Sequence, residues 1–289
     1  MLLNKMNSKK EKQYHIGCEP GDLTNYILLP GDPNRVKKIA GVWDEKEKIT
    51  ENREFFSMKG KFKGVEISCL STGIGGSSAT IVIEEAARLG VDTFIRVGTA
   101  GSLQKGIEMG DLVISTGAVR LEGASQDYIF LEYPALANYE IAMALIEACE
   151  RLGMKYHLGL TASQDSFYVG EGREGFGGYS NPENKDLISK LQMAKVSNIE
   201  MEVAPILTLA NLYGLRAGAV CLIVDSFLED KDKFIVKEED EKKLGLVASE
   251  AVVILSGWDK IKKEKNKKYL YPSLLNVPKM VKLKGNKLK

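Results

Sequence analysis

Short apolar runs alternate along the chain with longer amphipathic stretches. Five runs have the length and apolar character of buried strands, namely Val65–Ser71, Thr93–Val97, Leu112–Thr116, Tyr156–Ala162 and Ala217–Val224. Four stretches carry apolar residues at helical spacing, namely Ser77–Leu89, Asn138–Leu152, Glu202–Tyr213 and Glu239–Leu255. Strands that alternate with helices of this length predict a largely parallel sheet flanked by helices.

No internal repeat and no linker interrupts this alternation, so we expect one folded domain over residues 14–258 of the 289. Residues 1–13 are polar and lysine-rich, and we expect them to form a flexible amino terminus. Residues 259–289 are a basic extension in which tyrosines, leucines and a valine lie between lysines. This extension either docks on the domain through its apolar side chains or binds a polyanion.

Charge and composition exclude several classes of protein. Forty basic and thirty-nine acidic residues give a formal charge of +1, so no strong field attracts nucleic acid or a membrane surface. No run approaches the ~18 apolar residues of a membrane span, and the amino terminus lacks the apolar segment of a secretory signal. The four cysteines show no C-x-x-C spacing, which indicates buried, reduced thiols in a cytoplasmic protein without a metal cluster.

Three arginines lie where turns or strand ends are expected. They are Arg35 in Pro-Gly-Asp-Pro-Asn-Arg, Arg53 in Asn-Arg-Glu-Phe and Arg96 in Ile-Arg-Val-Gly-Thr. A buried guanidinium requires an anion, and its planar fork suits phosphate oxygens. If the three converge they form a phosphate site, to which Gly31 and Thr99 can add donors. The alternatives are an ordinary turn at Arg35 and a structural ion pair at Arg96.

Two further segments carry polar chemistry. Glu200-Met201-Glu202 begins an apolar helix, where a carboxylate either favours the helix dipole or accepts hydrogen bonds from sugar hydroxyls. Phe167, Glu171 and Arg173 offer an aromatic face and an ion pair that suit a flat polar heterocycle. Phe167 precedes a glycine-rich loop, 170–182, and Glu171 and Arg173 lie within it. We expect this loop to be mobile.

A glycine segment at 73–78 resembles a dinucleotide fingerprint only in part. It reads Gly-Ile-Gly-Gly-Ser-Ser, so Ser78 stands where the last glycine is required. We therefore expect no nicotinamide cofactor.

As a set, these motifs resemble the nucleoside phosphorylase family, and most closely its uridine phosphorylase branch. The resemblance runs from about Tyr14 to Leu255 and also includes Tyr-His-Ile-Gly, Ser-Phe-Tyr-Val-Gly and Glu-Met-Glu. It implies a single-domain α/β sandwich with a central mixed, partly barrel-like sheet flanked by helices. It also implies a homo-oligomer, with a dimer as the minimal unit and a hexamer built from such dimers as the usual assembly.

The resemblance assigns roles residue by residue. Phosphate is held by Gly31, Arg35, Arg53, Arg96 and Thr99. Ribose is held by Glu200, Met201, Glu202 and His15, the last reaching the 5′-hydroxyl in a neighbouring subunit. The base is held by Phe167, Glu171, Arg173 and Asp225. No cofactor and no metal are expected, apart from a potassium site at a subunit interface made by Glu54, Ile74 and Ser78.

The implied reaction is phosphorolysis of a ribonucleoside, with uridine as the leading candidate. Phosphate attacks C1′ through an oxocarbenium-like transition state and yields free base and ribose 1-phosphate. In this interpretation Arg96 orients the nucleophile and Glu202 fixes the ribose. Arg173 and Asp225 stabilise the departing base.

Two positions depart from the uridine pattern. Glu171 replaces a glutamine, and an ionised carboxylate only accepts where an amide both donates and accepts. Asp225-Ser226 replaces Asn-Arg, and an aspartate here is similar to the purine branch. A purine nucleoside phosphorylase acting on inosine, guanosine or adenosine is therefore the alternative. A hydrolytic nucleosidase and a non-catalytic nucleoside-binding protein also remain open, as do the preferred sugar and the oligomer size.

Overall fold

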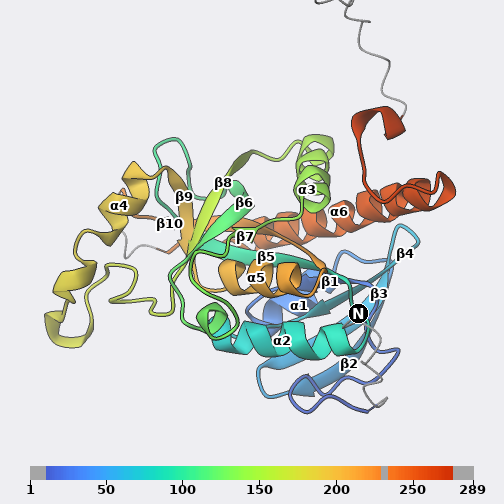
Figure 1. The fold of residues 1–289 in the computed structure, drawn as a ribbon, viewed down its shortest axis with the longest axis horizontal. Coiled ribbons are helices and arrows are strands. Elements are labelled where there is room, and N and C mark those ends of the chain that lie inside the picture. Colours follow the sequence, from blue (N-terminus) through green and yellow to red (C-terminus); the bar gives the residue numbers. More distant parts are fainter. Residues whose placement is uncertain (1–10, 229–233, 276–289) are drawn as a thin grey trace, which may run out of the picture.

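A computed structural model describes residues 11–228 and 234–275 of the chain (Figure 1). Among these residues, ten strands form one mixed sheet: β1 (Tyr26–Leu29), β2 (Glu45–Asn52), β3 (Phe55–Phe62), β4 (Val65–Leu70), β5 (Thr93–Ser102), β6 (Leu112–Arg120), β7 (Ala135–Leu136), β8 (Tyr156–Ser163), β9 (Val196–Glu200) and β10 (Arg216–Ser226). The α-helices are α1 (Pro33–Ala40), α2 (Gly76–Arg88), α3 (Tyr139–Leu152), α4 (Leu187–Met193), α5 (Val203–Leu212) and α6 (Glu238–Glu264). Short 3-10 helices cover Ala124–Asp127, Phe176–Gly178, Pro182–Asn184 and Pro272–Leu275.

Helices cover both faces of the sheet, as Figure 1 shows. Helices α1, α3 and α6 share one hydrophobic core with the sheet, and α2 and α5 share the other. Successive residues of a strand alternate between the two cores: in β10, Val220 and Leu222 face the first, whereas Cys221 and Ile223 face the second. Burial on both faces explains why this strand is a continuous apolar run in the sequence.

Part of the sheet closes on itself. Strands β10, β6, β8, β9 and β5 follow one another, and β5 pairs with β10 to complete a ring of five. The pairs β5–β10 and β6–β8 are parallel, whereas β6–β10 and β5–β9 are antiparallel. The mixed, partly barrel-like sheet expected from the family resemblance is thus confirmed. The largely parallel sheet predicted from the alternation of elements alone was wrong in this respect.

Several elements extend past their predicted ends. Strand β5 continues from Val97 to Ser102 and β6 continues to Arg120, because neighbouring strands pair with these polar and glycine-rich segments. Helix α6 runs on beyond Leu255 to Glu264, past the predicted domain boundary at 258. The hairpin of β2 and β3 was not predicted, since β2 is mostly charged and exposed.

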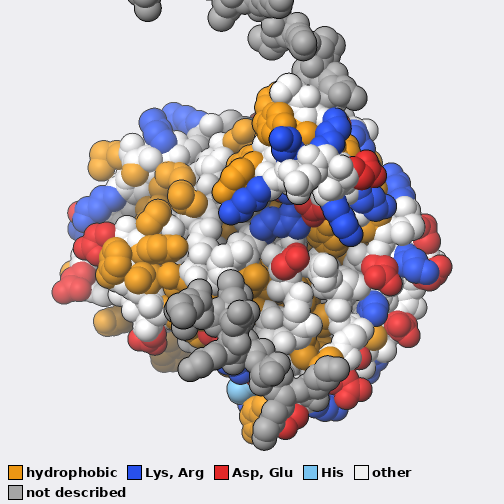
Figure 2. All heavy atoms as spheres, turned by 45° about the vertical axis from the view of Figure 1, so that its right-hand side comes forward, with side chains coloured by type: hydrophobic (Ala, Val, Ile, Leu, Met, Phe, Trp, Pro, Cys, Tyr) orange, Lys and Arg blue, Asp and Glu red, His pale blue; other side chains and the backbone are white. Residues whose placement is uncertain are grey.

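The described part of the basic extension is tied to the domain. Leu270 and Leu274 are buried, and the Leu270 N–H donates to the Tyr139 hydroxyl and to the Glu140 carboxylate, 3.1 Å away in each case. Docking through apolar side chains, one of the two predicted alternatives, therefore holds as far as residue 275. Figure 2 shows basic side chains gathered beside the place where the described chain ends. The exposed lysines of this segment are Lys260, Lys263, Lys265, Lys267 and Lys268.

Other predictions concern the termini, the thiols and the glycine-rich loop. Residues 1–10 and 276–289 lie outside the described residues, and with them most of the expected flexible amino terminus and the rest of the basic tail. All four cysteines are buried and free, as predicted. Within the described ranges, no helix is long and apolar enough to cross a membrane. The loop 170–182 contains turns and parts of two 3-10 helices, and its mobility stays a prediction.

Candidate active site

A cleft of about 730 Å³ lies at the carboxyl ends of β1, β5, β9 and β10. This edge is where ligands bind in parallel α/β sheets, and the volume suits a small organic ligand. Most of the residues predicted from the sequence line it: Gly31, Arg35, Glu54, Ile74, Arg96, Thr99, Phe167, Glu171, Glu200, Met201, Glu202 and Asp225. The fold thus brings together segments that are far apart in the chain.

Arg96 lies at one end of this cleft with its side chain buried. One terminal nitrogen donates to the Glu202 carboxylate and lies 3.7 Å from Glu200, and the other donates to Thr72 Oγ1 at 3.3 Å. Its Nε has no hydrogen-bond partner among the described residues. Burial alone would lower the pKa of Arg96, but Glu202 and Glu200 raise it above its ordinary value, so the side chain stays charged. A buried cation with an unused donor is suited to hold an anion.

The two glutamates at the start of α5 have different partners. Glu200 accepts hydrogen bonds from Ser163 Oγ at 2.6 Å and from the backbone N–H groups of Glu202 and Val203 at 2.7 and 2.9 Å. It therefore fixes the turn that presents Glu202. Burial, followed by the nearby Glu202 charge, raises the pKa of Glu200 to about 7. Glu202 itself accepts from Arg96 and from the Gly75 N–H at the start of α2, so its carboxylate faces the cleft.

Arg35 and Gly31 approach the cleft from the β1–α1 connection. Arg35 is buried on the first turn of α1, and its Nε donates to Glu241 at 3.1 Å. A Cβ at Gly31 would lie 3.5 Å from a terminal nitrogen of Arg96, so the absence of a side chain keeps this guanidinium open to the cleft. The sequence reasoning did not identify Glu241, because the partner of Arg35 comes from a distant helix.

Arg173 is buried beneath an aromatic cover. Its guanidinium carbon lies 4.8, 4.6 and 4.9 Å from the ring centres of Phe167, Phe227 and Phe234, within cation–π range. It donates to Asp225, and its Nε lies 3.7 Å from Glu171. Burial raises the pKa of Glu171 to about 8, and it also raises the pKa of Asp225. This group forms the second polar centre of the cleft.

Glycine at position 101 makes room for this centre. A Cβ at Gly101 would lie 2.8 Å from Asp225 Oδ2 and 2.6 Å from the Phe227 ring, both too close for any other residue. Phe234 and Val236 also line the cleft, although the sequence reasoning did not select them. Their segment, Lys-Phe-Ile-Val-Lys, is a short apolar run between lysines. Many surface loops contain such a run, so the sequence alone does not indicate a binding role.

Four predicted residues are not among those that line the cleft. Arg173 contacts the lining residues Glu171 and Asp225 and Ser78 contacts Glu54, whereas Arg53 and His15 lie elsewhere. Arg53 is exposed in the turn between β2 and β3, with its guanidinium 5.8 Å from the Tyr14 ring. His15 lies beside it: Asn52 donates to the His15 carbonyl at 2.7 Å, and the His15 Nδ1 is 2.6 Å from Glu85. Arg35 and Arg96 line the same cleft, whereas the β2–β3 turn carries Arg53 to the surface of this chain. The part of Arg53 in phosphate binding therefore stays a prediction.

The candidate potassium residues lie near the rim of the cleft. Ser78 Oγ donates to Glu54 Oε1 at 3.2 Å, and a Cβ at Gly73 would lie within 3 Å of both side chains. Ile74 is 77% exposed. No cluster of three or more His, Cys, Asp or Glu side chains suited to a metal occurs among the described residues. The role of these residues therefore stays a prediction.

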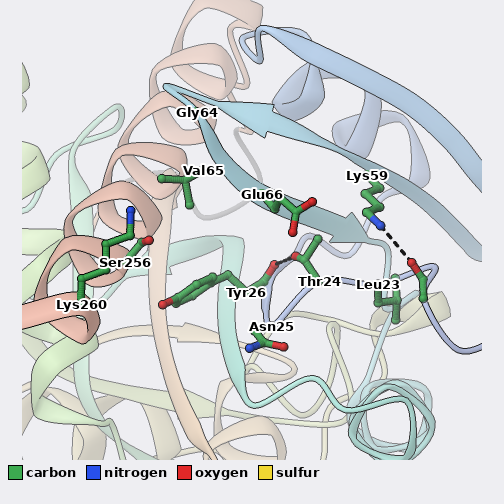
Figure 3. Close-up of a pocket in the computed structure, with 11 residues that line it drawn as sticks. Leu23, Thr24, Asn25, Tyr26, Lys59, Gly64, Val65, Glu66, Ser256 and Lys260 are labelled. Atoms are coloured by element: carbon green, nitrogen blue, oxygen red, sulfur yellow. Dashed lines mark hydrogen bonds between the residues drawn. The ribbon is translucent and has the colours of Figure 1, made fainter. Parts of the chain in front are cut away.

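A second hollow, of about 460 Å³, lies at the opposite ends of β1 and β4 (Figure 3). Figure 3 shows Tyr26, Glu66 and Lys59 around it, with Lys59 donating to a backbone carbonyl. None of the predicted site residues lines it, and it is smaller than the first. We therefore assign the active site to the cleft at the carboxyl ends of the strands.

Comparisons with known proteins agree with this geometry. Residues 25–257 match the family model described as the phosphorylase superfamily. The chain is 52% identical over 262 residues to the uridine phosphorylase of Thermococcus kodakarensis, covering 91% of this chain and 93% of the relative. It is 41% identical over 218 residues to the uridine phosphorylase of Escherichia coli, covering 74% and 86%. It is 37% identical over 222 residues to the guanosine phosphorylase of Halorubrum lacusprofundi, covering 77% and 87%.

Proposed function

The chain belongs to the phosphorylase superfamily, and we propose that it cleaves uridine with inorganic phosphate to give uracil and ribose 1-phosphate. It is then a pentosyltransferase whose two substrates are a nucleoside and phosphate. The similarity to uridine phosphorylases extends over nearly the whole chain, so it includes both polar centres of the cleft.

The contact between Arg96 and Glu202 is the observation that supports this function best. In phosphorolysis the incoming phosphate approaches C1′, and the neighbouring carbon carries the 2′-hydroxyl. A phosphate-binding cation and a hydroxyl-binding carboxylate must therefore lie side by side. A hydrolase would use water and would have no need of a buried arginine with a free donor beside the sugar.

The reaction uses both centres of the cleft. A phosphate oxygen held by Arg96 and Arg35 forms a bond to C1′ as the glycosidic C–N bond breaks, and the bonding electrons move to the base. Glu202 accepts hydrogen bonds from the ribose hydroxyls and holds C1′ in line. Arg173 and the groups around it receive the departing base and stabilise its negative charge.

Uridine is incubated with the protein in the presence and absence of phosphate to test this proposal, and free uracil and ribose 1-phosphate are quantified. We expect both products only when phosphate is present. Uracil release without phosphate would instead establish a hydrolytic nucleosidase. Tight uridine binding without cleavage at any phosphate concentration would establish a binding protein.

A purine nucleoside phosphorylase is the second candidate. Two acids near the base, Glu171 and Asp225, favour it, as does the similarity to a guanosine phosphorylase. The same assay with inosine, guanosine and adenosine distinguishes the two candidates. Cleavage of purine nucleosides without cleavage of uridine would replace uridine as the substrate.

The residues outside the cleft support a dimer as the minimal unit. His15 and Arg53 lie in one surface patch, linked through Tyr14 and Asn52. Both residue types suit an anionic or hydroxylated ligand, and in this proposal they complete the site of a neighbouring subunit in a hexamer built from dimers. The potassium site of Glu54, Ile74 and Ser78 and a cytoplasmic location belong to the same proposal.

A further inference from the structure

Two carboxyl groups share one guanidinium at the second polar centre. Glu171, Arg173 and Asp225 are exposed by only 3%, 4% and 2%. With both acids ionised the group would carry a net negative charge on side chains that are almost fully buried. Such an arrangement favours retention of one proton.

The geometry indicates which acid retains the proton. Burial raises the pKa of Asp225, but this acid accepts a hydrogen bond from a terminal nitrogen of Arg173, which favours its ionised form. Glu171 lies 3.7 Å from the Arg173 Nε, beyond ordinary hydrogen-bond distance, and receives less of the positive charge. The neutral acid is therefore Glu171.

The charged groups that face Glu171 act in opposite directions on its ionisation. Burial is the largest effect and raises the pKa of Glu171. Arg173 lowers it, whereas Asp225 on β10 and Glu200 on β9 raise it, and the result is about 8. At neutral pH the side chain is mostly a carboxylic acid with an O–H donor and a C=O acceptor.

A neutral carboxyl and a carboxylate recognise different base edges. Uracil presents a carbonyl acceptor beside a ring N–H donor, and a neutral acid pairs with both. A carboxylate is a double acceptor, so it loses the contact with the carbonyl. Guanine presents two adjacent N–H donors and satisfies the carboxylate fully.

We propose that Glu171 is the specificity-determining residue of this site, reading a uracil edge when it is protonated and a guanine-type edge when it is ionised. This inference rests on the proposed phosphorolytic function and adds to it. The base preference is then not a fixed property of the pocket but changes with pH in the range in which Glu171 titrates. A glutamine at this position would mimic the protonated form at every pH.

The test is the ratio of kcat/KM for uridine to kcat/KM for guanosine, measured from pH 6 to 10 at saturating phosphate. The ratio removes pH effects that both substrates share, including the ionisation of phosphate. We expect the ratio to fall by about tenfold per pH unit across the range, because uridine needs the protonated form of Glu171 and guanosine the ionised form. The separate profiles should bend near pH 8: kcat/KM for uridine falls above it, and kcat/KM for guanosine falls below it. A ratio that does not change across this range overturns the proposal.

Two variants locate the effect at Glu171. Glu171→Gln should cleave uridine and keep the ratio constant across the same range, since an amide does not titrate. Glu174→Gln makes the same chemical change at an exposed position of the same loop and should retain the wild-type dependence of the ratio on pH. A ratio that still falls with pH in Glu171→Gln assigns the titration to another group and overturns the inference. If the wild type releases no base from either nucleoside at any pH, the proposed function itself is wrong.

Discussion

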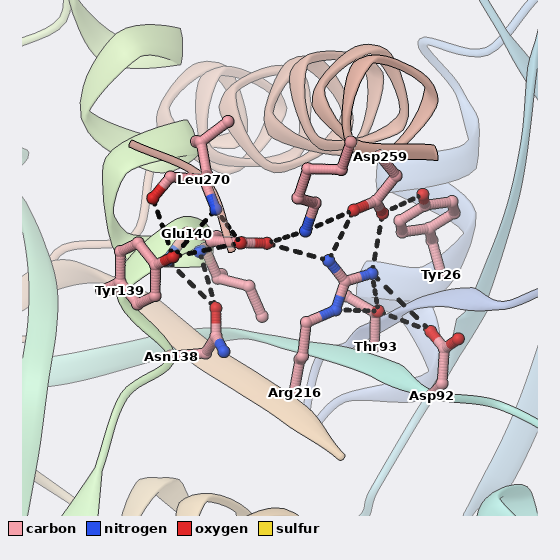
Figure 4. Close-up of polar contacts among 11 residues, drawn as sticks. Tyr26, Asp92, Thr93, Asn138, Tyr139, Glu140, Arg216, Asp259 and Leu270 are labelled. Carbon is pink, nitrogen blue, oxygen red and sulfur yellow. Dashed lines mark hydrogen bonds and ion pairs between the residues drawn. The ribbon is translucent and has the colours of Figure 1, made fainter. Parts of the chain in front are cut away.

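Charged side chains gather at both ends of β5 and β10, and the two groups differ in how completely they are paired. At the amino ends, Arg216 donates to Thr93, Glu140 and Asp259, and Lys262 donates to the same two acids (Figure 4). Two cations there meet three anions, since Asp92 also lies 3.8 Å from Arg216, and each nitrogen of the Arg216 guanidinium has a partner. At the carboxyl ends, Glu200 and Glu202 share Arg96, whose Nε has no hydrogen-bond partner among the described residues.

The pKa values show the same difference. Burial would raise the pKa of Asp259, but hydrogen bonds from Arg216, Tyr26 and Lys262 bring it down to about 2. Burial raises the pKa of Glu171 to about 8 and that of Glu200 to about 7, because local cations offset it only in part. A fully paired cluster stabilises the fold, whereas an incompletely paired one can bind a ligand. Burial of charge alone therefore does not identify an active site.

Removal of Arg96 should have the largest effect on function. In Arg96→Ala the phosphate loses its buried cation, and we expect kcat/KM for uridine with phosphate to fall by about 10²–10³-fold. Steady-state kinetics over a range of phosphate concentrations measures the effect, with a thermal melt to confirm folding. Near-normal phosphorolysis in the folded variant would contradict the assignment.

Arg216→Ala is the matched control at the other end of the same strands. It removes a largely buried arginine, with 21% of its side chain exposed against 5% for Arg96, from the fully paired cluster. It should therefore lower the unfolding midpoint and leave kcat/KM of the folded protein within a few-fold of wild type. A large loss of kcat/KM in this variant would show that the two clusters are not functionally distinct.

Asp259→Asn should have a smaller, pH-dependent effect on stability. The pKa of Asp259 is lower in the folded protein than in the unfolded chain, so its contribution is present above about pH 4 and is lost as pH falls toward 2. We expect the variant to lose about 2 kcal/mol of unfolding free energy at pH 7, a difference that shrinks between pH 4 and pH 2. Urea unfolding at several pH values measures it. Asp92→Asn, an exposed acid 3.8 Å from the same Arg216, should change much less.

The sequence predicted elements well where burial on both faces produces an apolar run. The strand ending at Val97 was found, but its continuation through Gly98 to Ser102 was not, since this segment is stabilised by pairing with β10 and β9. Strand β2 escaped prediction because its Glu-Lys-Glu-Lys sequence is typical of exposed surface. Pairing between distant segments is the information that local patterns lack.

The candidate site was predicted only in part for the same reason, since local patterns do not show which distant segments pack together. Arg96 and Glu202 were placed in one site by the family resemblance, and the pairing of β5 with β9 brings the segments that carry them together. Arg53 could not be excluded from the cleft, since a turn between two unpredicted or poorly predicted strands has no defined direction. Glu241 and Phe234 were missed because neither belongs to a motif, and only the packing of α6 and its preceding segment brings them to the site.

Arg88→Ala should have the smallest effect and defines the baseline for both clusters. Arg88 pairs with Glu84 one turn earlier on α2, and its side chain is 45% exposed. Because water screens such a pair, we expect the unfolding free energy to change by less than about 0.5 kcal/mol and kcat/KM to stay unchanged. Urea unfolding and uridine kinetics on the same preparation measure both quantities. If Arg88→Ala lost as much unfolding free energy as Asp259→Asn, the number of charge pairs, rather than their burial and complete pairing, would determine the stability of this fold.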